Sequence, residues 1–430
     1  MASHIGCVFP RIVTGCYSRR QLSELDSMRL SPFPLFPRTA RVEPLAEGPP
    51  LSILRAHPQL KTVRAEDWAR LVVGSPFLEW GVFSAFEDSG CIGPHAGWSG
   101  QTFSLEDDAA RCVGLVPGFI KAHSAGEFVF DHEWAHAAAG AGIPYYPKLI
   151  IATPFTPVEA RKLYLEPGAE EAGPLFVESL WALAMEQKLS GVHWLFVTEE
   201  EAAMLIGHGY ATRLGVQYHW LNRGYESFDQ WLETFTSKRR RAIRRERRTI
   251  AEQGISVEVL EGDALTPVHM DLAYELYLTT IDKKVWGRQY LNREFFQLLL
   301  QRARERLVFA VARRANEVIA GAFMLQGEDT LYGRYWGCRE EVKFLHFELC
   351  CYTPVQLCIE RGLHRFNAGA QGEHKYERGF DPVQTTSAHR LAAPILDSAV
   401  RDFLRRESEV IRRELERLVL QSPSRAVRER

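Results

Sequence analysis

The densest chemical signal in the chain is a run of basic residues between Lys238 and Arg248, which reads KRRRAIRRERR. It holds seven arginines and one lysine, with Glu246 as its acid. On a helix these charges cover more than one face, so nearby acids cannot pair all of them. Two interpretations remain: a solvated surface, or a site for the phosphates of tRNA, CoA or a lipid pyrophosphate. The residues expected to hold phosphate are Lys238, Arg241, Arg244, Arg245 and Arg248.

A literal HExxH motif runs from His132 to His136. On a helix the two histidines would share one side and could bind zinc, with Glu133 as a base. The preceding residues, 127–130, instead read as a strand, and Gly142 stands where a metzincin would have its third ligand. The sequence therefore predicts no metal site. A zinc hydrolase using His132, Glu133 and His136 is the lesser alternative.

Two polar clusters follow in the last third of the chain. His346 and Glu348 stand two residues apart near the start of a predicted helix. Glu373, His374 and Lys375 follow a glycine-rich bend, where backbone can approach a ligand closely. These side chains could move protons in catalysis. A structural network of salt bridges is the alternative.

The elements that must position these residues are read from hydrophobic periodicity and turn signals. In the first half we predict helices at 77–89, 174–189 and 199–206, and strands at 101–105, 112–120, 127–130, 192–197 and 216–221. In the second half we predict helices at 225–235, 237–253, 267–282, 293–304 and 345–360, strands at 255–260, 307–312, 318–325, 330–336 and 364–368, and a charged helix at 398–420.

Length and composition bound the class of protein. A chain of 430 residues with 46% hydrophobic and 25% charged residues suggests two or three globular domains. The net charge of −2 gives no global attraction to nucleic acid or membrane, and no apolar run is long enough to cross a bilayer. Eight cysteines without a CxxC pair indicate reduced thiols and a reducing, intracellular compartment.

The N-terminal segment differs from the rest. Residues 1–42 hold six arginines, no lysine, five serines and two acids, and a proline-rich stretch ends near Pro37. Such composition is typical of organellar transit peptides, which would place the protein in a plastid or mitochondrion rather than the cytoplasm. A disordered tail is the alternative. We therefore expect four segments: a leader at 1–50, domains at 51–215 and 216–397, and a C-terminal helix and tail at 398–430.

The order of helices, a three-strand meander, then a helix and a strand matches the core of the GNAT acyltransferase fold. Several strings also resemble the FemAB-like family of predicted N-acyltransferases, from about Ser75 to Ser387. These are SPFL at 75, EFVFDH at 127, YYPKL at 145, TPFTP at 153, VQYHW at 216, KRRRAIR at 238, LYGRYWG at 331, HFEL at 346 and GAQGEHK at 369. The resemblance implies an α/β (α+β) fold of tandem GNAT-like domains with mixed, splayed sheets, and acyl transfer to an amine.

The resemblance also implies where the chemistry lies. In GNAT folds the splayed sheet offers free backbone N–H groups to a carbonyl, and the polar residues 330–337, 346–348 and 369–375 should flank that opening. The expected catalytic residues are Glu373, His374, Lys375, Glu348 and His346, with Glu373 or His374 favoured as the base. Arg334 and Tyr335 are expected to polarise the carbonyl or hold phosphate. Asp131, His132, Lys148, Trp336 and Gln371 are expected to line the acceptor cleft, although Asp131 and His132 could equally form a buried hydrogen-bonded pair.

The expected activity is therefore transfer of an acyl or aminoacyl group from acyl-CoA or aminoacyl-tRNA to a small-molecule or peptide amine. No tightly bound cofactor is expected. The sequence after Trp336 lacks the Q/RxxGxG/A turn with which many GNAT proteins bind CoA pyrophosphate, which argues against CoA. The aminoacyltransferases that the family resembles use aminoacyl-tRNA, which suits the basic run. A non-catalytic RNA-binding protein on a GNAT scaffold is the alternative.

Overall fold

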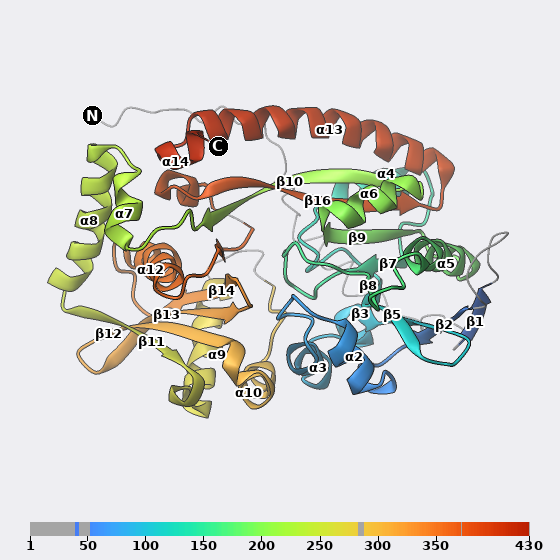
Figure 1. Cartoon of the computed structure of the whole chain (residues 1–430), viewed down its shortest axis with the longest axis horizontal. Helices are drawn as coiled ribbons and strands as arrows, with labels where there is room; N and C mark the ends of the chain where they lie inside the picture. Colours follow the sequence, from blue (N-terminus) through green and yellow to red (C-terminus); the bar gives the residue numbers. More distant parts are fainter. Residues whose placement is uncertain (1–38, 43–51, 283–287, 371, 430) are drawn as a thin grey trace.

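The computed structural model describes residues 39–42, 52–282, 288–370 and 372–429. Figure 1 shows two α/β halves side by side, connected by long strands and overlaid by one long helix. In the described residues, no helix is long and apolar enough to span a membrane. Among the described residues, no disulfide joins the cysteines, which are Cys91, Cys112, Cys338, Cys350, Cys351 and Cys358.

The first half alternates short strands with helices. Its elements are β2 (Ser52–His57), α2 (Ala65–Leu71), α3 (Trp80–Asp88), β3 (Trp98–Gly100), β4 (Thr102–Glu106), β5 (Cys112–Val116), β6 (Gly118–Lys121), α4 (His132–Gly140), β7 (Lys148–Ile151), β8 (Tyr164–Leu165), α5 (Ala172–Glu186), β9 (Gly191–Val197), α6 (Glu199–Gly207) and β10 (Ala211–Leu221).

The second half has the predicted order of helices, meander, helix and strand. Its elements are α7 (Phe228–Glu233), α8 (Ser237–Glu252), β11 (Ile255–Glu261), α9 (Pro267–Asp282), α10 (Arg293–Arg302), β12 (Leu307–Arg314), β13 (Glu317–Gln326), β14 (Thr330–Cys338), α11 (Leu345–Phe347), the π-helical turn η5 (Glu348–Tyr352), α12 (Thr353–Glu360), β15 (Arg365–Asn367), the 3-10 segment η6 (Glu373–Arg378), β16 (Asp381–Leu391), α13 (Pro394–Leu420) and α14 (Arg425–Arg428).

One mixed sheet runs through both halves. In the described part of the chain it has eleven strands, in the order β11-β12-β13-β14-β15-β10-β16-β9-β7-β6-β3. Strand β10 pairs with β15 of the second half and with β16, and β16 pairs in turn with β9 of the first half. The expected boundary at 215/216 lies inside β10, which is continuous from Ala211 to Leu221. The two halves therefore meet through paired backbone.

A shared hydrophobic core reinforces this junction. Phe86 of α3 stacks on Phe295 of α10 with ring centroids 4.4 Å apart. A β-carbon on Gly81 would come within 2.4 Å of the backbone oxygen of Arg302, so only glycine allows α3 to approach α10 this closely. Substitution of Gly81 should push the two halves apart.

Helix α13 crosses both halves along the top of Figure 1. Arg213 of β10 holds Glu407 of α13 through Nε and Nη2, at 2.9 and 2.8 Å. Near the other end, the Tyr376 hydroxyl donates to the backbone oxygen of Leu418. The predicted amphipathic C-terminal helix is therefore a brace across the shared sheet.

Several sequence expectations differ from the structure. Residues 112–120 form two strands in different sheets, because the chain turns at Pro117 between β5 and β6. Residues 127–130 form no strand, and Phe128 takes a left-handed backbone conformation there. Strand β16 escaped prediction because its polar stretch does not alternate. Within the expected leader, β1 (Thr39–Val42) pairs with β2, and the rest of the leader lies outside the described residues.

Candidate active site

The second half contains a parting of two parallel strands. Strands β14 and β15 pair over three positions, ending at Tyr332 and Asn367. In the described residues, no strand pairs with β14 beyond Tyr332 on that side. The register between β13 and β14 shifts at this point, because Met324 pairs with Gly333 and Phe323 with Tyr335. Arg334 is thus the extra residue of a β-bulge, a feature that often lies beside active sites.

Several polar side chains share one face of the sheet at this parting. Asn367 pairs with Tyr332 on one side and with His219 of β10 on the other. Side chains alternate along a strand, so Arg365 lies on the same face as Asn367. The first half covers this face: the Phe77 ring packs edge-on against Tyr332 at 5.2 Å between centroids. The parting therefore opens toward the junction of the two halves.

Arg334 lies in this covered space, and no acidic side chain in the described part of the chain pairs with it. Its guanidinium stacks over the rings of Phe77 and Tyr332, at 4.8 and 5.5 Å from their centroids. Nη1 donates to the oxygen of Gly333 at 2.8 Å, while Nε and Nη2 are buried with no hydrogen-bond partner among the described residues. Burial lowers the pKa of Arg334 to about 10, still high enough to keep the side chain charged at neutral pH.

Lys375 closes the end of the parting. Its ammonium donates to the backbone oxygens of Ala368 and Gly369, at 2.6 and 2.9 Å, directly after β15. Its side chain is buried, and this burial lowers its pKa to about 8. Lys375 can therefore be neutral or charged near physiological pH, as a proton-transfer residue needs to be.

His346 and His374 meet beside the parting. Their ring centroids are 5.1 Å apart, and His346 also lies 5.1 Å from the Trp336 ring. Burial and the nearby cations Lys375 and Arg378 lower the pKa of both histidines to about 4. Both are therefore neutral at physiological pH. The structure brings these two predicted residues together with Lys375.

The two acids expected in catalysis lie elsewhere. Arg247 of α8 donates to both carboxylate oxygens of Glu348, at 2.9–3.1 Å, and Thr353 donates to one of them. Glu373 is exposed and acts electrostatically on Tyr218. Neither acid is held toward the backbone of β14. Of the other residues expected here, Tyr335 packs on Tyr277 and Phe323 in the core, and Gln371 lies outside the described residues.

A second cluster of predicted residues lies in the first half. Lys148 is fully buried and holds Glu127 and Asp131 at 2.8 and 2.5 Å, and the Tyr145 hydroxyl donates to Asp131. The lysine lowers the pKa of Asp131 despite its burial, whereas burial raises the pKa of Glu127 to about 7. Asp131 is thus paired with Lys148 and Tyr145, and the triad joins β7 to the start of α4.

The HExxH motif lies on helix α4, and the residues before it form no strand. The predicted strand at 127–130, one of the reasons for rejecting a zinc site, was therefore wrong. His132 and His136 are therefore one helical turn apart, and His136 is exposed. Trp134, between them, is buried against His389. Among the described residues, no group of three or more His, Cys, Asp or Glu side chains converges as metal ligands would.

The first half has its own pair of parallel strands. Strand β7 pairs with β9 from Leu149 to Ile151. Beyond that point the segment around residues 160–162 lies against the end of β9. The Ala160 backbone N–H donates to the Phe196 oxygen, and the Lys162 ammonium donates to the backbone oxygens of Ala160 and Phe196. This loop of the first half therefore fills the space where β7 and β9 part. The second parting is the better candidate for binding a substrate.

Helix α8 carries the basic run on the outer side of the second half (Figure 1). Ile243 and Ile250 are buried beneath it, and Glu246 pairs with Arg378. Arg244 and Arg248 pair with Asp229 and Glu252. Exposed Lys238, Arg241 and Arg245 have no carboxylate partner among the described residues, and their spacing places them on one face of the helix.

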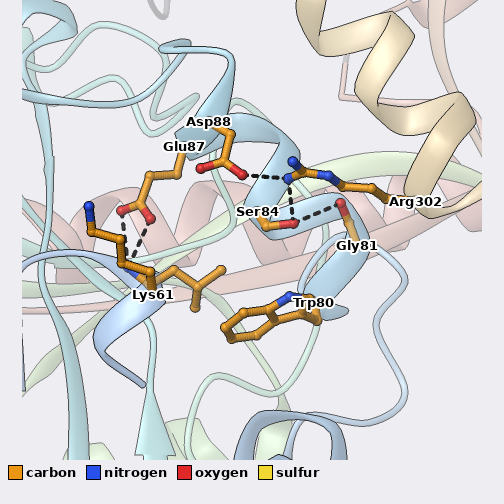
Figure 2. A pocket seen from close by; sticks show the side chains of 8 residues that line it. Lys61, Trp80, Gly81, Ser84, Glu87, Asp88 and Arg302 are labelled. Carbon is orange, nitrogen blue, oxygen red and sulfur yellow. Dashed lines mark hydrogen bonds and ion pairs between the residues drawn. The ribbon is translucent and has the colours of Figure 1, made fainter. Parts of the chain in front are cut away.

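Two cavities lie where the halves meet. The larger, of about 450 Å³, is lined by α3 and by Arg302 of α10; Figure 2 shows that Arg302 holds Asp88 and Ser84 there. The smaller, of about 290 Å³, is lined by Trp98, His123 and Phe155 of the first half and by residues 288–292 of the second. Of the charged residues that line the larger cavity, Arg302 pairs with Asp88, and Glu87 accepts a hydrogen bond from the backbone N–H of Leu60.

Sequence reasoning missed His219, Gln217, Arg365 and Glu159. Gln217 donates to the oxygen of Pro157 at 2.8 Å, and its side-chain oxygen faces Nε2 of His219 at 3.1 Å. The histidine proton therefore lies on Nε2, and Nδ1 is buried with no hydrogen-bond partner in the part of the chain that the structure describes. The half-buried Glu159 interacts electrostatically with Arg365. Gln217 and His219 stand in one of the family-like strings, but only the pairing of β10 with β15 brings them to this site.

Comparison with known proteins places these observations in a family. Residues 59–426 match the model of the FemAB-like family, described as peptidoglycan biosynthesis/recognition. No curated protein matches the chain. Among solved structures, FemX aligns with a TM-score of 0.50 and 11% identity, over 81% of this chain and 100% of that one.

Two further structures align with lower scores. L-PGS from Bacillus licheniformis aligns with a TM-score of 0.45 and 13% identity, over 75% of this chain and 95% of that one. A tandem GNAT protein from the clavulanic acid biosynthesis pathway aligns with a TM-score of 0.42 and 11% identity, over 79% and 99%. At such identities the likeness concerns the fold. The predicted family resemblance and the tandem GNAT-like fold are confirmed.

Proposed function

Because the chain belongs to the FemAB-like family, we propose that it transfers an acyl or aminoacyl group from an activated donor to an amine. The observation that supports this most is the parting of β14 and β15 beyond Tyr332 and Asn367, with a β-bulge at Arg334. Backbone N–H groups without a strand partner can stabilise the oxyanion that forms when an amine attacks a carbonyl. The reaction would take place in this opening.

Lys375 is the proposed acceptor of the ammonium proton. As a neutral amine it can donate its two hydrogens to the oxygens of Ala368 and Gly369, which leaves its lone pair free. Its lowered pKa of about 8 supports this role. Glu373 and Glu348 support it less, since one is exposed and the other is bound by Arg247.

Helix α8 is the proposed binding site for the donor. The face that carries Lys238, Arg241 and Arg245 extends as far as Arg248, which is ten helical steps from Lys238, or about 15 Å along the helix. That length exceeds one pyrophosphate and suits successive phosphates of a nucleic-acid backbone, which favours aminoacyl-tRNA over acyl-CoA. Two ion pairs connect α8 to the segments beside the parting: Arg247 with Glu348 of η5, and Glu246 with Arg378 of η6.

A ligand-dependent thermal shift tests the donor. Aminoacyl-tRNA should raise the melting temperature by mass action, more than uncharged tRNA or acetyl-CoA at equal ionic strength. Incubation with an amine such as lysine or a short peptide should then give an acylated product, detected by mass spectrometry. A donor that binds without any product would favour the second candidate, an RNA-binding protein, which the unpaired cations of α8 also support.

A further inference from the structure

Arg334 presents an empty binding edge. An arginine binds a carboxylate or phosphate most strongly through two parallel N–H groups. In this protein the Nε and Nη2 atoms of other arginines bind a carboxylate in that way; these are Arg55 with Glu106, Arg213 with Glu407, Arg306 with Glu79 and Arg417 with Glu414. The same two atoms of Arg334 are buried and have no partner among the described residues.

An arrangement of this kind is unfavourable unless something occupies it. A buried charge without a counter-charge costs free energy, and most buried polar atoms in proteins are hydrogen-bonded. The rings of Phe77 and Tyr332 hold the guanidinium in place from the side of the first half. Arg334 is therefore fixed in position before any partner arrives.

The surroundings add positive charge. Lys375 is near enough to Arg334 for the guanidinium charge to help lower the pKa of the lysine. Nε of Arg365 is also buried, with no hydrogen-bond partner among the described residues. His219 lies within reach of all three cations, which together with burial lower its pKa to about 3 and keep it neutral. Glu159 acts electrostatically on Arg365, whereas the described residues include no carboxylate with such an effect on Arg334.

A glycine lies where the bend after β15 meets the bulge. A β-carbon on Gly369 would lie 3.8 Å from the Gly333 oxygen and 3.9 Å from Nη1 of Arg334, which are ordinary contact distances, so the bend and the bulge do not press against each other at this glycine. The buried edge of Arg334, the buried Nε of Arg365 and the nearby Lys375 together provide more positive charge than one carboxylate would balance. A phosphate, with more oxygens and up to two negative charges, matches them better.

We propose that the parting of β14 and β15 binds a phosphate ester of one of the substrates, held by the Nε–Nη2 edge of Arg334 together with Arg365. This deepens the proposed function, because it names a chemical group of the substrate at the reacting site. The phosphate could belong to a nucleotide or to a lipid headgroup. The binding itself involves no group transfer.

Inorganic phosphate titrated into the full chain tests this, with ³¹P line broadening and the melting temperature as readouts and chloride held at equal ionic strength. Phosphate should bind, and glycerol 3-phosphate and adenosine monophosphate then distinguish a lipid-like from a nucleotide-like source. R334K keeps the charge but loses the paired N–H groups, and should weaken phosphate binding about tenfold or more. R365Q serves as the second variant, should R334K fold poorly.

Matched controls make the outcome decisive. R306K makes the same change at an arginine whose Nε–Nη2 edge binds Glu79. R239K makes it on α8, where Nε and Nη2 of Arg239 are also buried but have no partner in the described ranges and lie away from Lys375. Both should bind phosphate as the unaltered protein does. The proposal is overturned if phosphate binds no better than chloride, or if acetate binds equally well. It is also overturned if changes on α8, either R239K or K238Q/R241Q/R245Q, abolish phosphate binding while R334K and R365Q do not. Acyl transfer without phosphate binding would overturn this proposal alone, and phosphate binding without transfer would overturn the proposed function alone.

Discussion

Tyr332 and Asn367 form the last residue pair between β14 and β15, and beyond them the two strands part. The bulge at Arg334 follows two residues after Tyr332, and the bend that leads to Lys375 follows Asn367. The strand geometry therefore brings Arg334 close to Lys375, although the two residues are 41 positions apart in the sequence. The predictions below follow from this arrangement and from the contacts that support it.

Lys375 should be required for turnover as a neutral amine. K375R keeps a positive charge but cannot lose its proton near neutral pH, so it should lose transfer activity by about 100-fold or more, as should K375M. In the unaltered protein the rate should rise as the pH increases through about 8, because the ammonium form is inactive. A pH profile of single-turnover transfer measures this. Full activity of K375R would contradict the assignment.

The exposed face of α8 should determine the affinity for RNA. Reversing Lys238, Arg241 and Arg245 to glutamate should weaken tRNA binding and flatten its dependence on salt, because fewer counterions are released. The matched control reverses Arg405, Arg406 and Arg412 on α13, which carry the same charge on a different exposed surface. Filter binding at several salt concentrations compares the two. Equal losses would show a non-specific charge effect rather than a site.

Glu348 should act in stability and not in proton transfer. E348Q weakens the paired contact with Arg247 and leaves that guanidinium with Gln356, which should lower the free energy of unfolding by about 1.5–3 kcal/mol. Urea denaturation measures the change, and R247Q combined with E348Q should lose less than the sum of the single variants. Loss of turnover in folded E348Q, with stability unchanged, would restore the catalytic role expected from the sequence.

Lys148 should hold the first half together. K148M leaves the carboxylates of Glu127 and Asp131 buried without their cation, which should cost about 3–5 kcal/mol of stability. The loss should be smaller at pH 6 than at pH 8, because the raised pKa of Glu127 lets that carboxyl become neutral. Thermal or urea unfolding at both pH values checks this. An exposed lysine such as Lys188 changed to methionine should alter stability little.

Acid should unfold the protein through its buried histidines. His193 and His219 have pKa values lowered to about 3 by burial and nearby cations. Between pH 6.5 and 3 the unfolded chain therefore binds more protons, so stability should fall as the pH drops through this range. The urea midpoint at pH 7, 5.5 and 4.5 measures the trend. H219N should reduce the slope and the exposed H136Q should not; a flat profile would contradict the account.

Local sequence pattern predicted much of the second half. Helix α9 was predicted with the bounds that the structure has, and the meander β12–β14 stands where alternating apolar residues and polar turns placed it. The parting and the meeting of His346, His374 and Lys375 followed from the family resemblance. Such local signals suffice where an element buries one regular face.

Long-range pairing accounts for what the sequence did not reveal. The role of β16 depends on pairing with β9, nearly 200 residues earlier, and its own residues do not alternate clearly. Glu348 looked catalytic because its partner, Arg247, lies 101 residues away. His219 and Arg365 belong to the candidate site only because β15, which carries Asn367, pairs with both β14 and β10 and so brings them beside the parting. Tertiary contacts of this kind leave no periodic signal in one sequence.

A crystal structure with a hydrolysis-resistant donor analogue, an amide-linked 3′-aminoacyl adenosine on a short RNA helix, tests the central claim most directly. The acyl carbonyl oxygen should lie within hydrogen-bond distance of a backbone N–H of β14 beyond Tyr332, with Lys375 next to the position of the attacking amine. Binding of the acyl group in the cavity beside Trp80 and Arg302, or anywhere else outside the parted strands, would contradict the account.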